Sequence, residues 1–306
     1  MKGKVKYSSD DLKPGGVGMR RWFLMLLSLC TLFYAFGADR LNVVVTIPPL
    51  GSLTRELVGD KGEVTVLLPP GASPHVYEPT ADKMKLIARA DLFVENGAGL
   101  EMWAEKMLKG SSNRKLVLVV ASKGIKLIGA KAGHEGKRTR GGNPHVWLDP
   151  ILAKKMAHNI EKGLEQVDPE NKAYYRENLR KLQAKLDALD REIRRRIGGI
   201  RDKRAVVFHP AWDYFARRYG IQIVGVVEKS PGKSPTPRDI ATIIREIKRY
   251  KVKVIFIEPQ FNPKVAEMIA HEANVKLATL DPLGSSKEDY FKLMRRNLKA
   301  IEEVFR

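Results

Sequence analysis

Eight short apolar runs alternate with helix-like stretches along this chain, and that alternation limits the fold more than any other feature of the sequence. The runs, rich in β-branched residues, lie at 41–47, 63–69, 92–95, 115–121, 204–208, 221–227, 252–257 and 275–280. Helical patterns cover 51–58, 80–89, 99–109, 150–166, 237–250, 263–272 and 286–304. Short apolar runs of this kind are typical of strands buried on both faces of a sheet. The pattern therefore predicts an α/β protein whose mainly parallel sheets are joined by crossover helices.

One long helix is predicted between the two halves of the chain. Residues 170–197 contain no glycine or proline, and apolar residues recur along them at steps of three or four: Tyr175, Leu179, Leu182, Leu186, Leu189, Ile193 and Ile197. Such a stripe predicts a helix about 40 Å long with one buried face. Asp168 suits its N-cap with Pro169 at the first helical position, and Gly198 suits its end. A coiled-coil dimer is the alternative, but the stripe is one helix long and α/β segments flank it.

We therefore predict two lobes, each a mainly parallel sheet flanked by helices, joined by a rigid helical strut. The predicted parts are an N-terminal lobe over 39–167, a linking helix over 168–198 and a C-terminal lobe over 199–306.

The N-terminal segment has the pattern of an export signal. Two arginines precede an uncharged run at 22–36 that ends in small residues, which predicts a signal peptide over 1–38 and a periplasmic or otherwise extracytoplasmic protein. The run is shorter than the roughly 20 residues that span a bilayer, so an uncleaved leader that anchors the protein is the alternative. Met19 directly precedes the arginines, so 1–18 could be a mis-called start.

Cysteine usage and charge restrict the chemistry further. The single cysteine, Cys30, lies in the predicted leader, so a mature chain would have no disulfide and would build any metal site from His, Asp and Glu. Residues 1–38 hold six of the 55 basic and two of the 35 acidic residues, which leaves 49 and 33, a net charge of +16. Export and the lack of a basic arm with interleaved aromatics argue against nucleic-acid binding. We therefore interpret the charge as a solvated basic surface.

Three of the six histidines and one aspartate share an unusual setting. Each lies in a predicted loop beside a proline, and most of them follow a predicted strand: His75, His145, His209 and Asp281. Proline stiffens such loops because it fixes its own backbone and restricts the residue before it. Ligands of open α/β sheets bind beyond the carboxyl ends of the strands. These four side chains are therefore candidates for one binding site in a cleft between the lobes.

Three imidazoles and a carboxylate suit a four-coordinate Zn²⁺ site. The alternative for each residue is an ordinary role as a helix cap or hydrogen-bond partner at a strand end. Glu258 ends another strand and could accept a hydrogen bond from a metal-bound imidazole, with a purely structural role as its alternative. His158 and His271 lie on predicted helices and are expected to be surface or packing residues, and His134 lies in a polar loop.

Five segments carry a resemblance to a known family. They are 74–103, 143–150 (NPHVWLDP), 207–220 (VFHPAWDYFARRYG), 255–262 (IFIEPQFN) and 280–301. In this order they resemble the zinc/manganese solute-binding family of bacterial ABC importers over nearly the whole mature chain. The resemblance implies two α/β lobes joined by one long helix, with a metal in the cleft between them. It also implies that His75, His145, His209 and Asp281 are the metal ligands.

The resemblance implies a function as well. Manganese members of the family carry a carboxylate where this chain has His209, which favours Zn²⁺ over Mn²⁺. Zinc members often have a long His- and Asp-rich loop before the second ligand, whereas 131–142 is short and basic with one histidine. We expect a monomeric subunit that captures Zn²⁺ and delivers it to an ABC permease driven by its ATPase. A manganese or iron importer subunit of the same family is the alternative.

An enzyme is the remaining alternative. A secreted zinc hydrolase would need an open metal position for water and a general base. Four protein ligands would leave no such position, and the HExxH motif of zinc proteases is absent from the sequence. We therefore predict that the chain is not an enzyme.

Overall fold

The computed structural model describes Met1 and residues 40–130, 142–230 and 232–306. The predicted signal peptide and most of the basic loop at 131–142, with His134, therefore lie outside the described residues. Residues 41–306 form one compact unit. Within the described residues no helix is both long enough and apolar enough to cross a membrane.

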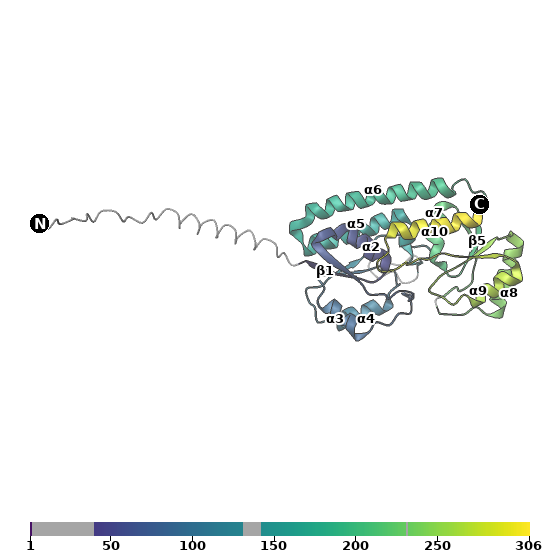
Figure 1. The fold of residues 1–306 in the computed structure, drawn as a ribbon. Coiled ribbons are helices and arrows are strands. Elements are labelled where there is room, and N and C mark those ends of the chain that lie inside the picture. Colours follow the sequence, from purple (N-terminus) through teal and green to yellow (C-terminus); the bar gives the residue numbers. More distant parts are fainter. Residues whose placement is uncertain (2–39, 131–141, 231) are drawn as a thin grey trace. The chain divides into compact units, whose positions relative to one another are not determined.

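Two four-stranded sheets of the same topology make up the framework (Figure 1). The first has the order β2-β1-β3-β4, from β1 (Leu41–Val45), β2 (Gly62–Val66), β3 (Leu92–Glu95) and β4 (Val117–Val120). The second has the order β6-β5-β7-β8, from β5 (Arg204–Val207), β6 (Gln222–Val226), β7 (Val254–Ile257) and β8 (Lys276–Thr279). Every strand pair is parallel. The predicted fold class, two parallel-sheet lobes with flanking helices, is confirmed.

Helices cover both faces of each sheet. They are α2 (Pro48–Val58), α3 (Ala81–Ala88), α4 (Met102–Gly110), α5 (Pro150–Val167), α6 (Lys172–Ile197), α7 (Asp213–Tyr219), α8 (Pro237–Tyr250), α9 (Lys264–Ala273) and α10 (Tyr290–Phe305). All the helices that the sequence predicts are present, with ends shifted by a few residues. Helix α7 was not predicted, because its seven residues are too few to establish a period of 3.6.

The long helix exists, but it begins differently from the prediction. A 3₁₀ turn over Pro169–Asn171 precedes α6, whose N-cap is Asn171. Asp168 caps neither helix with its side chain and instead accepts hydrogen bonds from Tyr175 Oη (2.5 Å) and the Asn171 amide (2.8 Å). The 26 residues of α6 span about 39 Å, and the helix ends at Gly198 as predicted.

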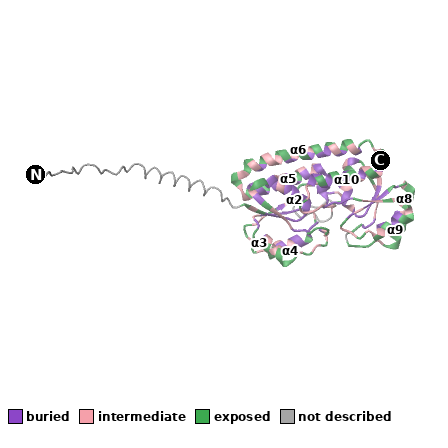
Figure 2. Cartoon of the chain, viewed as in Figure 1, coloured by how far each residue is buried: buried purple, intermediate pink, exposed green. Residues whose placement is uncertain are grey.

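The two sheets share one hydrophobic core. A single buried cluster contains residues of β1 and β3 from the first sheet, of β5 and β7 from the second, and of α5, α6 and α10. Two smaller clusters lie between the first sheet and α3 and α4, and between the second sheet and α8 and α9. Figure 2 shows the buried side of α6 facing this shared layer, and its exposed side facing away. The continuous core therefore fixes the two lobes against each other.

Topology decides where a ligand binds. In each sheet the first strand lies inside, so the chain moves to one side for the second strand and to the other side for the third. The crevice at such a switch point, beyond the carboxyl ends of the strands, is the usual binding site of an open α/β sheet.

Candidate metal centre

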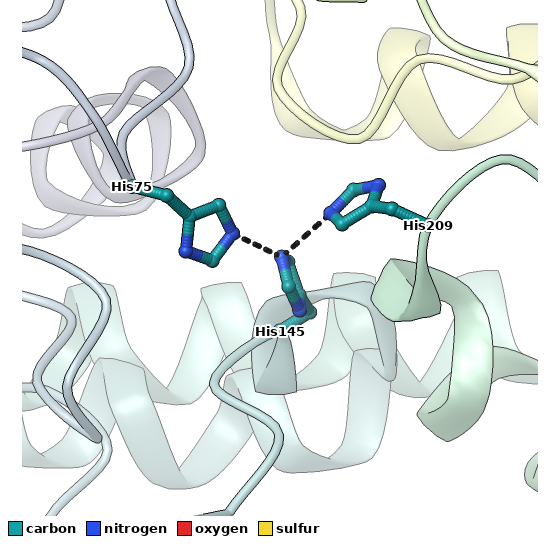
Figure 3. A group of neighbouring side chains, drawn as sticks. All are labelled: His75, His145 and His209. Atoms are coloured by element: carbon teal, nitrogen blue, oxygen red, sulfur yellow. Dashed lines mark hydrogen bonds between the residues drawn. The ribbon is translucent and has the colours of Figure 1, made fainter. Parts of the chain in front are cut away.

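Three imidazoles meet at one point between the sheets (Figure 3). His75 lies in the loop after β2, His145 just before the 3₁₀ turn Val146–Leu148, and His209 two residues after the end of β5. The Nε2 atom of His145 is 3.2 Å from that of His75 and 3.1 Å from that of His209. One nitrogen of each ring lies within 4.8 Å of the others. Two nitrogens bound tetrahedrally to one Zn²⁺ would be about 3.3 Å apart, so this spacing suits a shared cation.

Asn143 fixes the orientation of the His145 ring. The Asn143 side-chain oxygen accepts hydrogen bonds from the backbone N–H of His145 (3.0 Å) and from His145 Nδ1 (2.8 Å). The amide nitrogen of Asn143 donates to Asp213 Oδ2 (2.9 Å), which determines which end of the amide faces the ring. Nδ1 of His145 therefore carries the proton, and Nε2 presents a lone pair to the shared point.

Glu258 plays the same part for His209. Its Oε1 atom accepts a hydrogen bond from His209 Nδ1 (2.7 Å), and both side chains are buried. A carboxylate that accepts from Nδ1 leaves Nε2 of the ring free to bind a cation. Burial raises the pKa of Glu258, whereas the nearby His209 lowers it.

The loop that carries His75 is held by an indole. Trp103 Nε1 donates a hydrogen bond to the backbone oxygen of Pro74 (2.8 Å). Burial, and then the charge of His209, lowers the pKa of His75 to about 4. Burial also lowers the pKa of His145 well below its usual value. These two rings are therefore neutral at pH 7, which is the form that binds a metal.

The lowered pKa of His75 predicts that the metal-free protein loses stability in mild acid. A histidine in the unfolded chain titrates near about 6.5, so between that pH and about 4 the unfolded state binds more protons than the folded one. His75 should therefore reduce the free energy of unfolding by about 2 kcal/mol between pH 7 and pH 5. Urea unfolding of the chelator-treated protein at both pH values measures this, with His75→Gln as the comparison. An equal pH dependence in the two proteins would contradict the prediction.

The structure does not bring Asp281 into the group of three histidines. Its Oδ1 atom accepts hydrogen bonds from the Gln260 amide and from the backbone N–H groups of Leu283 and Gly284, all at 3.0 Å. Its Oδ2 atom forms an ion pair with Arg296 (3.1 Å). Burial alone would raise the pKa of Asp281, but these hydrogen bonds and Arg296 hold it below its usual value. The role of Asp281 as a ligand stays a prediction.

The other histidines of the described chain lie elsewhere. His158 is half-exposed on α5, 3.7 Å from Glu161, and His271 is exposed on α9. The interpretation of both as surface residues agrees with these positions.

A small cavity adjoins the three imidazoles. Its volume is about 10 Å³, room for roughly one water-sized occupant, and its walls include all three rings together with Glu258, Gln260 and Phe261. The Gln260 side-chain nitrogen bonds to Asp281, and its oxygen is buried without a hydrogen-bond partner among the described residues. A buried acceptor of this kind costs free energy unless a ligand or water satisfies it. Three nitrogen donors and an unsatisfied oxygen therefore fit a cation.

Residues 43–304 match the protein family described as "Zinc-uptake complex component A periplasmic". The chain belongs to this family. The high-affinity zinc uptake system protein ZnuA of Bacillus subtilis is 36% identical over 279 residues, which cover 87% of this chain and 88% of that protein. The zinc-binding protein AdcA of Streptococcus pyogenes is 30% identical over 316 residues, which cover 92% of this chain and 61% of AdcA.

Solved structures show the same fold. The crystal structure of a ZnuA superposes with a TM-score of 0.78 at 30% identity, covering 88% of this chain and 100% of that one. FpvC of Pseudomonas aeruginosa, solved with Mn²⁺, superposes with a TM-score of 0.77 at 32% identity, covering 87% and 99%. The resemblance to the solute-binding family of ABC importers is thereby confirmed. The preference for its zinc branch is confirmed by the zinc-uptake family match and the zinc-uptake relative of Bacillus subtilis.

A substitution of Glu258 tests whether its carboxylate makes the His209 ring a stronger zinc ligand in this member of the zinc-uptake family. Glu258→Gln retains an oxygen that accepts from His209 Nδ1 but removes the negative charge that makes the ring a better ligand. We expect zinc affinity to fall by about 10-fold to 100-fold, the usual effect of losing such a supporting group. Competition with a chromophoric zinc chelator measures the change. The exposed Glu303→Gln is the matched control, and an unchanged affinity in Glu258→Gln would show that the carboxylate does not act on the metal.

Proposed function

We propose that this chain is the extracytoplasmic subunit that captures Zn²⁺ and hands it to an ABC permease driven by its ATPase. The convergence of His75, His145 and His209 is the observation that carries the proposal. Membership in the zinc-uptake family supports it. Imidazole nitrogen is a good ligand for Zn²⁺, whereas Mn²⁺ favours oxygen ligands.

The proposed ligand set is the three histidines, with Asp281 as a fourth ligand. The shared core of the two lobes supports a small adjustment on metal binding, because α6 runs without a break along both of them. We propose further that the protein acts as a monomer, and that the leader at 1–38 directs its export. A leader that remains uncleaved would anchor it to the membrane.

We infer that the site does not catalyse a reaction. Hydrolysis at a zinc centre requires a general base near the metal-bound water. Among the described residues that line the cavity, Glu258 is the only carboxylate. It bonds to Nδ1 of His209, on the side of that ring away from the Nε2 atom that faces the shared point.

The metal bound by the native protein tests the proposal. Native mass spectrometry of protein purified without chelators should show one zinc ion per chain. In competition with an excess of Mn²⁺, the protein should keep zinc. Retention of manganese or iron in preference to zinc would favour another importer of the same family, and failure to bind any divalent metal would contradict the proposal.

A further inference from the structure

Arg296 of α10 holds the carboxylate that is the candidate fourth ligand. Its guanidinium lies 3.1 Å from Asp281 Oδ2 and 2.9 Å from Glu288 Oε2. Asp281 Oδ1 accepts from three hydrogen-bond donors, whereas Oδ2 accepts only from Arg296 among the described residues. Oδ2 is therefore the oxygen that could be released to a cation, and its release means breaking the pair with Arg296.

The backbone of Asp281 is fixed independently of its side chain. Its N–H donates to the Asn297 side-chain oxygen (2.8 Å), and its carbonyl oxygen accepts from the Asn297 amide (2.7 Å). Both bonds are buried and tie the end of β8 to α10. A change in what the carboxylate binds is therefore a rotation of the side chain on a fixed backbone.

Arg296 does not lose all its partners when Asp281 turns away. Glu288 Oε1 and Oε2 both lie within hydrogen-bond distance of Arg296 Nη2, at 3.2 and 2.9 Å. The guanidinium is half-exposed, so solvent also compensates it. The two carboxylates thus share one guanidinium, and exchange of one of them leaves no buried unpaired charge.

We propose that Arg296 is a specificity-determining residue that competes with the bound cation for Asp281 and so disfavours Mn²⁺ relative to Zn²⁺. With Asp281 held by Arg296, a water can complete the tetrahedral shell of a Zn²⁺ bound by the three imidazoles, so Zn²⁺ loses little affinity. Mn²⁺ prefers oxygen ligands and depends on Asp281 far more. A residue that withholds this oxygen therefore discriminates between the two metals, and discrimination is a difference between two affinities. This inference rests on the proposed function.

The test compares Mn²⁺ and Zn²⁺ affinities of Arg296→Met with those of the native protein, by titration with each metal chloride against a competing chelator. Mn²⁺ affinity should rise about 10-fold, and Zn²⁺ affinity should change by less than about 3-fold. Arg295→Met is the matched control: Arg295 is the next residue of α10, is equally exposed, and pairs with Glu192 instead. It should leave both affinities unchanged.

A second variant separates the exchange from a general effect of charge. Removing a positive charge near the site would by itself raise both affinities together, and that result would overturn the proposal. The double variant Arg296→Met, Asp281→Asn should lose the gain in Mn²⁺ affinity, because the freed oxygen is gone. A gain that persists without Asp281 would equally overturn it. A native protein that binds no Zn²⁺ would instead contradict the proposed function, so the two failures are distinguishable.

Discussion

Replacing His209 with alanine is expected to reduce zinc affinity by more than about 100-fold. Loss of a group that only supports a metal ligand usually costs 10-fold to 100-fold, and loss of a ligand should cost more. The ring contributes one of the three nitrogens that converge, and its Nε2 atom faces that of His145 at 3.1 Å. Chelator competition at pH 7 measures the affinity of the variant against that of the native protein.

Two control variants separate the loss of a metal ligand from other effects of the substitution. His158→Ala removes a half-exposed histidine of α5 that lies outside the group, and it should bind zinc like the native protein. His209→Gln retains an N–H donor for the buried Glu258, so it separates loss of the ligand from loss of that hydrogen bond. Suppose that the His209→Ala protein has the same Tm as the native protein. If it then still bound zinc within about 10-fold of the native affinity, the assignment of His209 as a ligand would be refuted.

The positions of the three histidines were accessible from the sequence because each depends on local structure. His75 and His209 follow strands, and proline stiffens the loops of all three. Parallel strands bring their carboxyl ends to one edge, so residues far apart along the chain meet there. The sequence could not establish the distances, because these depend on how the two lobes pack.

The partners of Asp281 could not be predicted in this way. Arg296 reaches it from α10, and the sequence pattern of α10 indicates which face is apolar but not which strand end its charged face meets. The role of Gln260, which lines the cavity and donates to Asp281, could not be predicted either. In the sequence it is an isolated polar residue of a loop. The role of Asn143 as the hydrogen-bond partner of His145 could have been predicted. Asn143 lies two residues before His145, in the segment that carries the family resemblance.

The spacing of apolar residues in the long helix also did not predict what its buried face packs against. The apolar stripe from Tyr175 to Ile197 indicates a buried face, and a strut between two separate lobes satisfies it as well as a shared core does. In the structure, Tyr219 of the unpredicted helix α7 donates to Asp190 of α6 (3.0 Å) and so ties the second lobe to the linking helix. The linking helix is therefore part of the core and does not bridge open solvent.

Trp147 connects the metal site to both lobes. It is fully buried, two residues from His145, and its ring packs against that imidazole with centroids 5.2 Å apart. Its indole N–H donates to the backbone oxygen of Pro282 (2.7 Å), next to Asp281, and its own carbonyl oxygen accepts from Tyr290 Oη (2.6 Å). One side chain thus holds the loops of two candidate ligands together.

Trp147→Ala is therefore expected to lower the free energy of unfolding by about 3–5 kcal/mol, the usual cost of truncating a buried tryptophan. For a chain of this size, that corresponds to a fall in Tm of roughly 6–20 °C, which differential scanning calorimetry of the metal-free protein measures. Trp147→Phe fills much of the same volume but removes the bond to Pro282, so it should lose only about 1–3 kcal/mol. Met102→Ala, at an exposed position of α4, is the control and should leave Tm nearly unchanged. If Trp147→Ala had the same Tm as the native protein, the indole would not be what holds the two loops in place. The rigidity of the site would then have to come from the prolines beside its histidines.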